Sequence, residues 1–132
     1  MTVRILCVDD DKDGCEMICV FLHTYNPSFI VTPVRSAKDA MKAIESEKFD
    51  IYIIDNWLGD TTGIEMCREI RITDTVTPVI LYSAVAGSAE IEEGLAAGAN
   101  EYLVKPNDLP NLGPTIERLV DKQARQPNAM VA

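Results

Sequence analysis

The fold of this chain is decided by the stretch Phe49-Asp50-Ile51-Tyr52-Ile53-Ile54-Asp55. Its four consecutive β-forming residues, Ile51 to Ile54, show no polar alternation, which is typical of a strand buried on both faces. The run ends directly on Asp55, and Gly59 and Gly63 then mark a loop. A carboxylate at the carboxyl end of a parallel strand occupies the edge where open α/β sheets bind ligands. Taken alone, the stretch equally allows Asp55 to be an ordinary turn or cap residue.

Four further apolar runs are predicted to be strands, and segments with helical spacing separate them. These runs are Val3–Val8, Phe29–Val34, Pro78–Tyr82 and Glu101–Val104. Strand and helix alternate five times, so we predict an α/β fold: a doubly wound, five-stranded parallel sheet with helices on both faces. Residues 1–122 are predicted to form one domain, and residues 123–132 a flexible C-terminal tail.

Several helix ends can be predicted from local chemistry. Ser36 is expected to cap the second helix, with Asp39 three residues further on. Ser88 is expected to cap the fourth helix, whose Ile91 and Leu95 would face inward. Gly94 weakens that helix by about 1 kcal/mol relative to alanine. Pro114 lies within the last helical pattern and predicts a kink or a restart of the helix there.

Composition excludes several classes of protein. The chain has 132 residues, 47% of them hydrophobic, which suits one globular domain with a real core. No apolar run is long enough to span a membrane, and the first residues lack the layout of a signal peptide. The net charge of −9 argues against nucleic-acid binding by this domain. The four cysteines form no CxxC pair, so we expect buried, reduced thiols and a cytoplasmic location.

Polar residues end four of the predicted strands. Asp9 and Asp10 follow the first strand, Asp55 the third, Ser83 the fourth and Lys105 the fifth. Right-handed crossovers place the carboxyl ends of all strands at one edge of the sheet. The five side chains are therefore expected to converge there. Polar turn residues that occur by chance would not explain well why four separate strands all end in this way.

This set of groups favours phosphoryl transfer. Three close carboxylates repel one another, and a hard cation such as Mg²⁺ removes the conflict. Lys105 would supply a second positive charge, and Ser83 a hydroxyl donor to a phosphate oxygen. A carboxylate such as Asp55 can itself be the nucleophile and form an aspartyl phosphate. The chain contains no GxxxxGK[ST] loop for a nucleotide.

At this point the sequence resembles the receiver domains of two-component response regulators, including the chemotaxis-type single-domain receivers. The resemblance covers residues 3 to about 122 and implies a flavodoxin-like (βα)5 fold. It is carried by Val8-Asp9-Asp10, Asp55, Ser83-Ala84 and Lys105-Pro106 together. The segment from Ala97 to Pro106 is especially similar to the family pattern.

The resemblance also implies roles for single residues. Asp55 would be the phosphoacceptor, and Lys105 would pair with the phosphoryl group. Asp9, Asp10, Asp55 and the backbone carbonyl of Trp57 would hold Mg²⁺, for which Mn²⁺ could substitute. The Lys105-Pro106 bond is expected to be cis. Ser83 and Tyr102 would form a switch pair: Ser83 would move toward the phosphate, and the Tyr102 ring would turn into the space that Ser83 leaves. Taken without the resemblance, Tyr102 is equally well explained as an ordinary half-buried aromatic residue of a strand.

The chain departs from the family pattern in the loop after Asp55, where Leu58-Gly59 replaces the usual Met-Pro pair. Two variable positions, Trp57 and Val85, are apolar here, and we expect them to hinder an attacking water and slow self-dephosphorylation. Asn107 replaces the aromatic residue often found after Lys-Pro. The surface formed by the fourth helix, fifth strand and fifth helix is therefore expected to be unusual.

The leading hypothesis is a phosphorylation-controlled signalling switch rather than a metabolic enzyme. Its implied partners are a histidine kinase or histidine phosphotransfer protein, a downstream target or attached output domain, and a second copy in a phosphorylation-dependent homodimer. One alternative is a Mg²⁺-dependent phosphohydrolase of haloacid dehalogenase type, but Trp57 stands where that family needs a second aspartate. The other is a degenerate receiver that binds partners constitutively, which the complete polar set disfavours.

Overall fold

The computed structural model describes residues 2–125. Five strands alternate with five helices along these residues, as the hydrophobic pattern predicts. In chain order they are β1 (Val3–Val8), α1 (Lys12–Tyr25), β2 (Phe29–Val34), α2 (Ala37–Ser46), β3 (Ile51–Ile54), α3 (Gly63–Thr73), β4 (Val79–Ser83), α4 (Ser88–Ala96), β5 (Glu101–Val104) and α5 (Leu109–Ala124).

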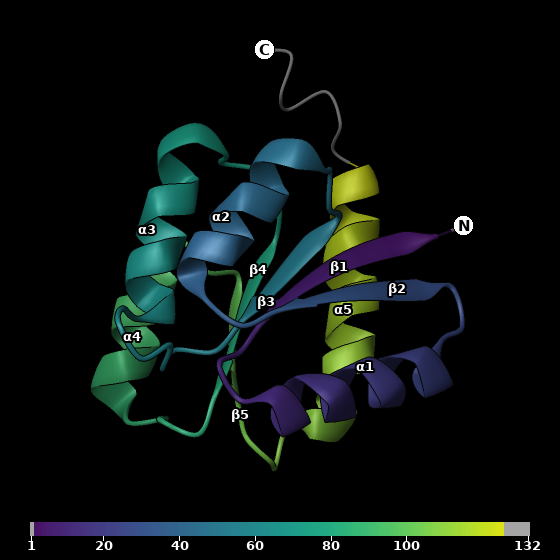
Figure 1. Cartoon of the computed structure of the whole chain (residues 1–132), viewed down its shortest axis with the longest axis horizontal. Coiled ribbons are helices and arrows are strands. Elements are labelled where there is room, and N and C mark those ends of the chain that lie inside the picture. The colour runs from purple at the N-terminus through teal and green to yellow at the C-terminus, as the bar shows by residue number, and fades with distance from the viewer. Residues whose placement is uncertain (1, 126–132) are drawn as a thin grey trace.

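The strands form one parallel sheet in the order β2-β1-β3-β4-β5. Helices α2, α3 and α4 cover one face, and α1 and α5 cover the other (Figure 1). The chain order reverses beside β1, which places β1 and β3 next to each other at the switch point where such sheets bind ligands. The predicted doubly wound α/β fold is confirmed.

Burial follows the strand pattern. All four residues of β3 are buried, as are all five of β4, because each of these strands has helices on both sides. Ile54 and Leu81 belong to the core beneath α2, α3 and α4, whereas Ile53 and Ile80 belong to the core beneath α1 and α5. The continuous apolar runs therefore mark strands that are buried on both faces.

Helix α4 differs from the sequence prediction in two ways. Its N-cap is Gly87 rather than Ser88, which is the first residue of the helix, and no side chain caps it. Leu95 is 46% exposed, whereas Ile91 packs against the core as expected. The reason is that Gly94 is the buried residue of this helix: a Cβ built there would lie 2.7 Å from Cδ1 of Leu81 and 3.0 Å from the Tyr102 ring. Close approach of the helix at Gly94 turns Leu95 toward solvent.

Helix α5 does not restart at Pro114. It begins at Leu109, has Pro110 in its first turn and continues through Pro114 to Ala124. A proline in a first turn loses no internal hydrogen bond, and Pro114 removes only the bond to the carbonyl one turn earlier. Leu112 and Ile116, both fully buried, hold the helix on the sheet on either side of Pro114. The helix runs two residues past the predicted boundary at 122, and most of the predicted tail lies outside the described residues.

The cap of α2, the state of the cysteines and the question of membrane-spanning helices were also addressed by the sequence predictions. Ser36 caps α2 by accepting a hydrogen bond from the N–H of Asp39, as predicted. All four cysteines are free thiols, and three of them are buried. Within residues 2–125, the structure contains no helix with the length and apolar character needed to cross a membrane.

We predict that Gly94→Ala destabilises the protein, although alanine is the better helix former by about 1 kcal/mol. The added methyl group must displace Leu81 or Tyr102, and overpacking of this kind costs about 1–3 kcal/mol. Urea unfolding should therefore show a lower free energy of unfolding. Ser88→Ala is the matched control in the same helix, because Ser88 is exposed and makes no capping bond; it should change stability by less than about 0.5 kcal/mol. A more stable Gly94→Ala variant would contradict this packing.

Candidate functional site

The predicted polar residues meet at the carboxyl edge of the sheet. Asp9 and Asp10 follow β1, and Asp55 follows the neighbouring β3. Their carboxylates can each offer one oxygen, and these three oxygens all lie within 4.8 Å of one another. Asp9 is 1% exposed, whereas Asp10 is exposed and Asp55 half-buried. The fold thus forces three acidic groups from two strands into one small volume.

Lys105 supplies a positive charge to this cluster. Its Nζ donates a hydrogen bond to Oδ2 of Asp9 over 2.6 Å and to Oδ2 of Asp55 over 3.1 Å. Burial alone would lower the pKa of Lys105, but the hydrogen bonds and charges of the two carboxylates outweigh burial and raise it. The ammonium group is therefore fully protonated at neutral pH. The peptide bond between Lys105 and Pro106 is cis.

The loop after β3 is shaped by Gly63, which the sequence pattern marked, and by Asn56, which it did not. Asn56 is 9% exposed, and its Oδ1 accepts a hydrogen bond from the N–H of Ile64, while its carbonyl accepts one from the N–H of Gly63. A Cβ at Gly63 would lie 2.4 Å from the carbonyl oxygen of Asp55, so this position requires glycine. The start of α3 is thereby fixed against the residue next to Asp55. The available signal was an asparagine two residues after the end of a buried strand, followed by a glycine at the start of the next helix.

The same loop turns sharply at Gly59, whose φ of +86° favours glycine. Trp57 and Thr62 pair across the loop, and the side chain of Leu58 is buried in the core. The N–H of Trp57 donates to Oδ1 of Asp55 over 3.2 Å, while the residue as a whole is 62% exposed. The Leu58-Gly59 pair therefore closes the loop without removing any carboxylate from the cluster.

Ser83 and Tyr102 lie on the neighbouring strands β4 and β5, where Tyr102 pairs with Leu81 and Ser83 with Val104. Ser83 is 1% exposed, and its Oγ accepts a hydrogen bond from the N–H of Val85 over 3.2 Å. The Tyr102 ring is 8% exposed, and its hydroxyl donates to the carbonyl of Val85. Burial raises the pKa of Tyr102, and a hydrogen bond with Ser83 partly offsets the rise. The Tyr102 ring therefore occupies an inward position.

Comparison with known proteins matches this geometry to a family. Residues 5–117 match the response regulator receiver domain. This chain belongs to that family. Among curated proteins it is 29% identical over 116 residues to the transcriptional regulatory protein ZraR of Escherichia coli, covering 88% of this chain and 26% of ZraR. It is 32% identical over 106 residues to the regulatory protein VanRc of Enterococcus gallinarum, covering 80% of this chain and 45% of VanRc.

Solved structures agree with the sequence comparison. A CheY-like receiver domain protein from Methanospirillum hungatei has a TM-score of 0.87 and 25% identity, covering 96% of this chain and 99% of that one. The BeF3-activated receiver domain of DrrB has a TM-score of 0.82 and 28% identity, covering 92% and 99%. The chain spans less than half the length of the curated relatives named above. It is a receiver domain of the two-component type, and the family's role as a phosphorylation-activated signalling switch is consistent with all these features.

The carboxylate cluster of this receiver domain fits a hard divalent cation. Mg²⁺ takes oxygen ligands, commonly one or two carboxylates together with waters and a carbonyl. Asp9, Asp10 and Asp55 supply that donor chemistry, and exposure of Asp10 leaves a path from solvent. The residues present therefore suit the group that the family resemblance implies.

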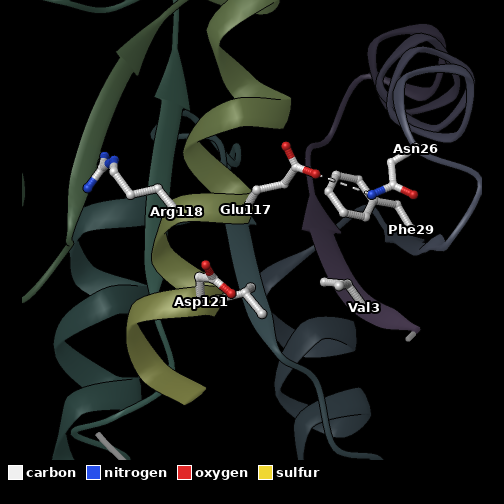
Figure 2. A pocket seen from close by; sticks show the side chains of 7 residues that line it. Val3, Asn26, Phe29, Glu117, Arg118 and Asp121 are labelled. Carbon is white, nitrogen blue, oxygen red and sulfur yellow. Dashed lines mark hydrogen bonds between the residues drawn. The ribbon is translucent and has the colours of Figure 1, made fainter. Parts of the chain in front are cut away.

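Two pockets differ in their distance from the site residues: one is lined by Lys105, and the other lies away from them. A pocket of about 230 Å³ is lined by Lys105 and Pro106 together with residues of α1 and β4. A second pocket of about 380 Å³ lies between β1, the α1–β2 connection and α5, where Asn26 donates a hydrogen bond to Glu117 (Figure 2). None of the cluster carboxylates lines either pocket, and Lys105, which contacts two of them, lines only the smaller one.

We predict that Mg²⁺ and Mn²⁺ stabilise the protein through this cluster. Binding to the folded state alone adds about 2.7 kcal/mol at a hundredfold excess over Kd, so the unfolding midpoint should rise with metal. The fluorescence of Trp57, the only tryptophan, offers a second readout two residues from Asp55. Asp10→Asn should abolish both responses. Asp60→Asn, an exposed carboxylate of the same loop, should keep them, and an unchanged response of Asp10→Asn would exclude this site.

Proposed function

We propose that Asp55 accepts a phosphoryl group from a phosphohistidine donor and that this modification sets the surface that partners bind. The observation that supports this most is the convergence of Asp9, Asp10, Asp55 and Lys105 at one sheet edge. In the transfer, the N–P bond of the donor breaks, an O–P bond forms at a carboxylate oxygen of Asp55, and the histidine nitrogen keeps the electron pair. The protein's task is to position groups and balance charge.

Each residue has a distinct role in this proposal. Asp9, Asp10, Asp55 and the carbonyl of Trp57 would hold Mg²⁺ or Mn²⁺, which supplies positive charge to the transferred group. Lys105 already contacts Oδ2 of Asp55 and would pair with a phosphoryl oxygen attached there. Asp55 is half-buried, so a donor can reach its carboxylate from solvent.

The switch would act through Ser83, Val85 and Tyr102. Ser83 accepts the N–H of Val85, and Tyr102 donates to the carbonyl of the same residue, so Val85 links the two side chains. If the Ser83 hydroxyl moves to a phosphoryl oxygen, the Val85 backbone and the start of α4 move with it. Because the ring of Tyr102 is already inward, phosphorylation would stabilise this arrangement by a population shift.

The partners follow from the same proposal. A histidine kinase or histidine phosphotransfer protein would supply the phosphoryl group, and a downstream protein, an attached output domain or a second copy of the receiver would read the α4–β5–α5 surface. A cytoplasmic location and the single domain over residues 1–122 also remain predictions.

The test is to incubate the protein with Mg²⁺ and acetyl phosphate and to record its intact mass. One phosphoryl group should be added to the wild type and to Asp60→Asn, and none to Asp55→Asn. Steady hydrolysis of acetyl phosphate without a mass gain would favour the phosphohydrolase. Neither gain nor hydrolysis, even with a histidine-phosphorylated donor, would indicate a degenerate receiver.

We further predict that the phosphoryl group on Asp55 is long-lived. Trp57 and Val85 are apolar and, at 62% and 44% exposure, face the solvent from which a hydrolytic water must come; Trp57 also contacts Asp55 through its backbone N–H. The Trp57→Asn variant should lose the phosphoryl group faster than the wild type after acetyl phosphate is removed, as followed by intact mass. Ile72→Asn, an exposed apolar residue of α3, is the matched control and should have no effect. A wild-type lifetime of only seconds would contradict the prediction.

A further inference from the structure

The aromatic ring of Tyr82 lies against the ammonium group of Lys105. The Nζ atom of Lys105 is positioned over this ring, 5.4 Å from its centroid. A cation within about 6 Å of a ring centroid, over the ring face, is attracted by the ring quadrupole. Tyr82 and Lys105 also line the same pocket of about 230 Å³, so both side chains face one space beside the carboxylate cluster.

Strand β4 places the ring there with little freedom to move. Tyr82 is 2% exposed and packs in the core beneath α1 and α5 with Leu103 and Ile116. Its neighbour Ser83 follows on the strand and therefore points to the opposite face of the sheet. At the end of β4, Ser83 therefore places a hydroxyl on one face of the sheet, and Tyr82 places an aromatic ring on the other.

Lys105 needs a fixed contact of this kind. Its side chain is 24% exposed and long, and both of its hydrogen-bond partners are carboxylates that the proposed cation site also uses. An ammonium held only by Asp9 and Asp55 would have to exchange hydrogen-bond partners when those carboxylates bind metal or Asp55 accepts a phosphoryl group. The π face of the Tyr82 ring is no ligand for a hard cation, so its attraction for Lys105 persists through those events.

We propose that Tyr82 is a positioning residue for Lys105, holding its ammonium group at the phosphoryl site through the face of the aromatic ring. This inference rests on the proposed role of Lys105 in phosphoryl transfer. It assigns to Tyr82 a function beyond filling the core, and it predicts that the electron density of the ring matters as well as its volume.

The experiment replaces Tyr82 with phenylalanine or with pentafluorophenylalanine, which keeps the shape of the ring and reverses its quadrupole. The first readout is urea unfolding without metal or phosphodonor, in the wild-type and Lys105→Met backgrounds. Fluorination should lower the unfolding midpoint more when Lys105 is present. The excess should correspond to roughly a twofold to thirtyfold change in the unfolding equilibrium constant. The second readout is the rate of phosphorylation by acetyl phosphate, which should fall by a similar factor.

Phe29→pentafluorophenylalanine is the matched control, because Phe29 is buried in the same core and no cation is recorded over its ring within the described chain. It should show no dependence on Lys105 and no change in rate. Equal effects of fluorination at residue 82 with and without Lys105 would overturn the proposal, as would a coupled effect that leaves the rate unchanged. If the wild type takes no phosphoryl group, the proposed function fails, and the unfolding comparison alone decides whether the ring holds Lys105.

Discussion

The structure depends on a charge conflict that the fold itself creates. Parallel strands that all end at one edge bring the oxygens of Asp9, Asp10 and Asp55 within 4.8 Å of one another, and Asp9 is almost completely buried. A buried carboxylate must be paired, and Lys105 provides the pairing from the end of β5. One ammonium group faces three carboxylates, so negative charge remains in excess. That excess is what makes the site suited to a divalent cation.

The loops at this edge of the sheet connect the residues of the site to helices α3 and α4. The loop after β3 is pinned to α3 through Asn56 and Gly63, and the loop after β4 is tied to Ser83 and Tyr102 through Val85. Helix α4 lies on Tyr102 at Gly94, where only a glycine fits. Helix α4 thus packs on the ring whose hydroxyl binds the carbonyl of Val85, so a movement of the Tyr102 ring would act directly on the face of that helix.

The sequence was sufficient for the fold and for the grouping of Asp9, Asp10, Asp55 and Lys105, because both follow from strand periodicity. Residues 51–54 and 79–82 are apolar without alternation, which marks them as strands. Once a strand is located, the polar residue that ends it can be named directly from the sequence. What could not be predicted depends on close packing between distant segments. The exposure of Leu95 follows from the approach of α4 to Leu81 at Gly94, and the unbroken α5 follows from burial of Leu112 and Ile116 around Pro114. The contact of Tyr82 with Lys105 likewise joins two strands whose register is set only by the folded sheet.

The most direct test of the account is to locate the phosphoryl group after transfer from a histidine-phosphorylated phosphotransfer protein. Borohydride reduces an aspartyl phosphate to homoserine, which peptide mass spectrometry can assign to a position. The account predicts homoserine at residue 55, dependent on Mg²⁺ and on Lys105. Homoserine at Asp9, Asp10 or Asp60 instead, or unchanged labelling of Asp55 without metal and in Lys105→Met, would contradict it.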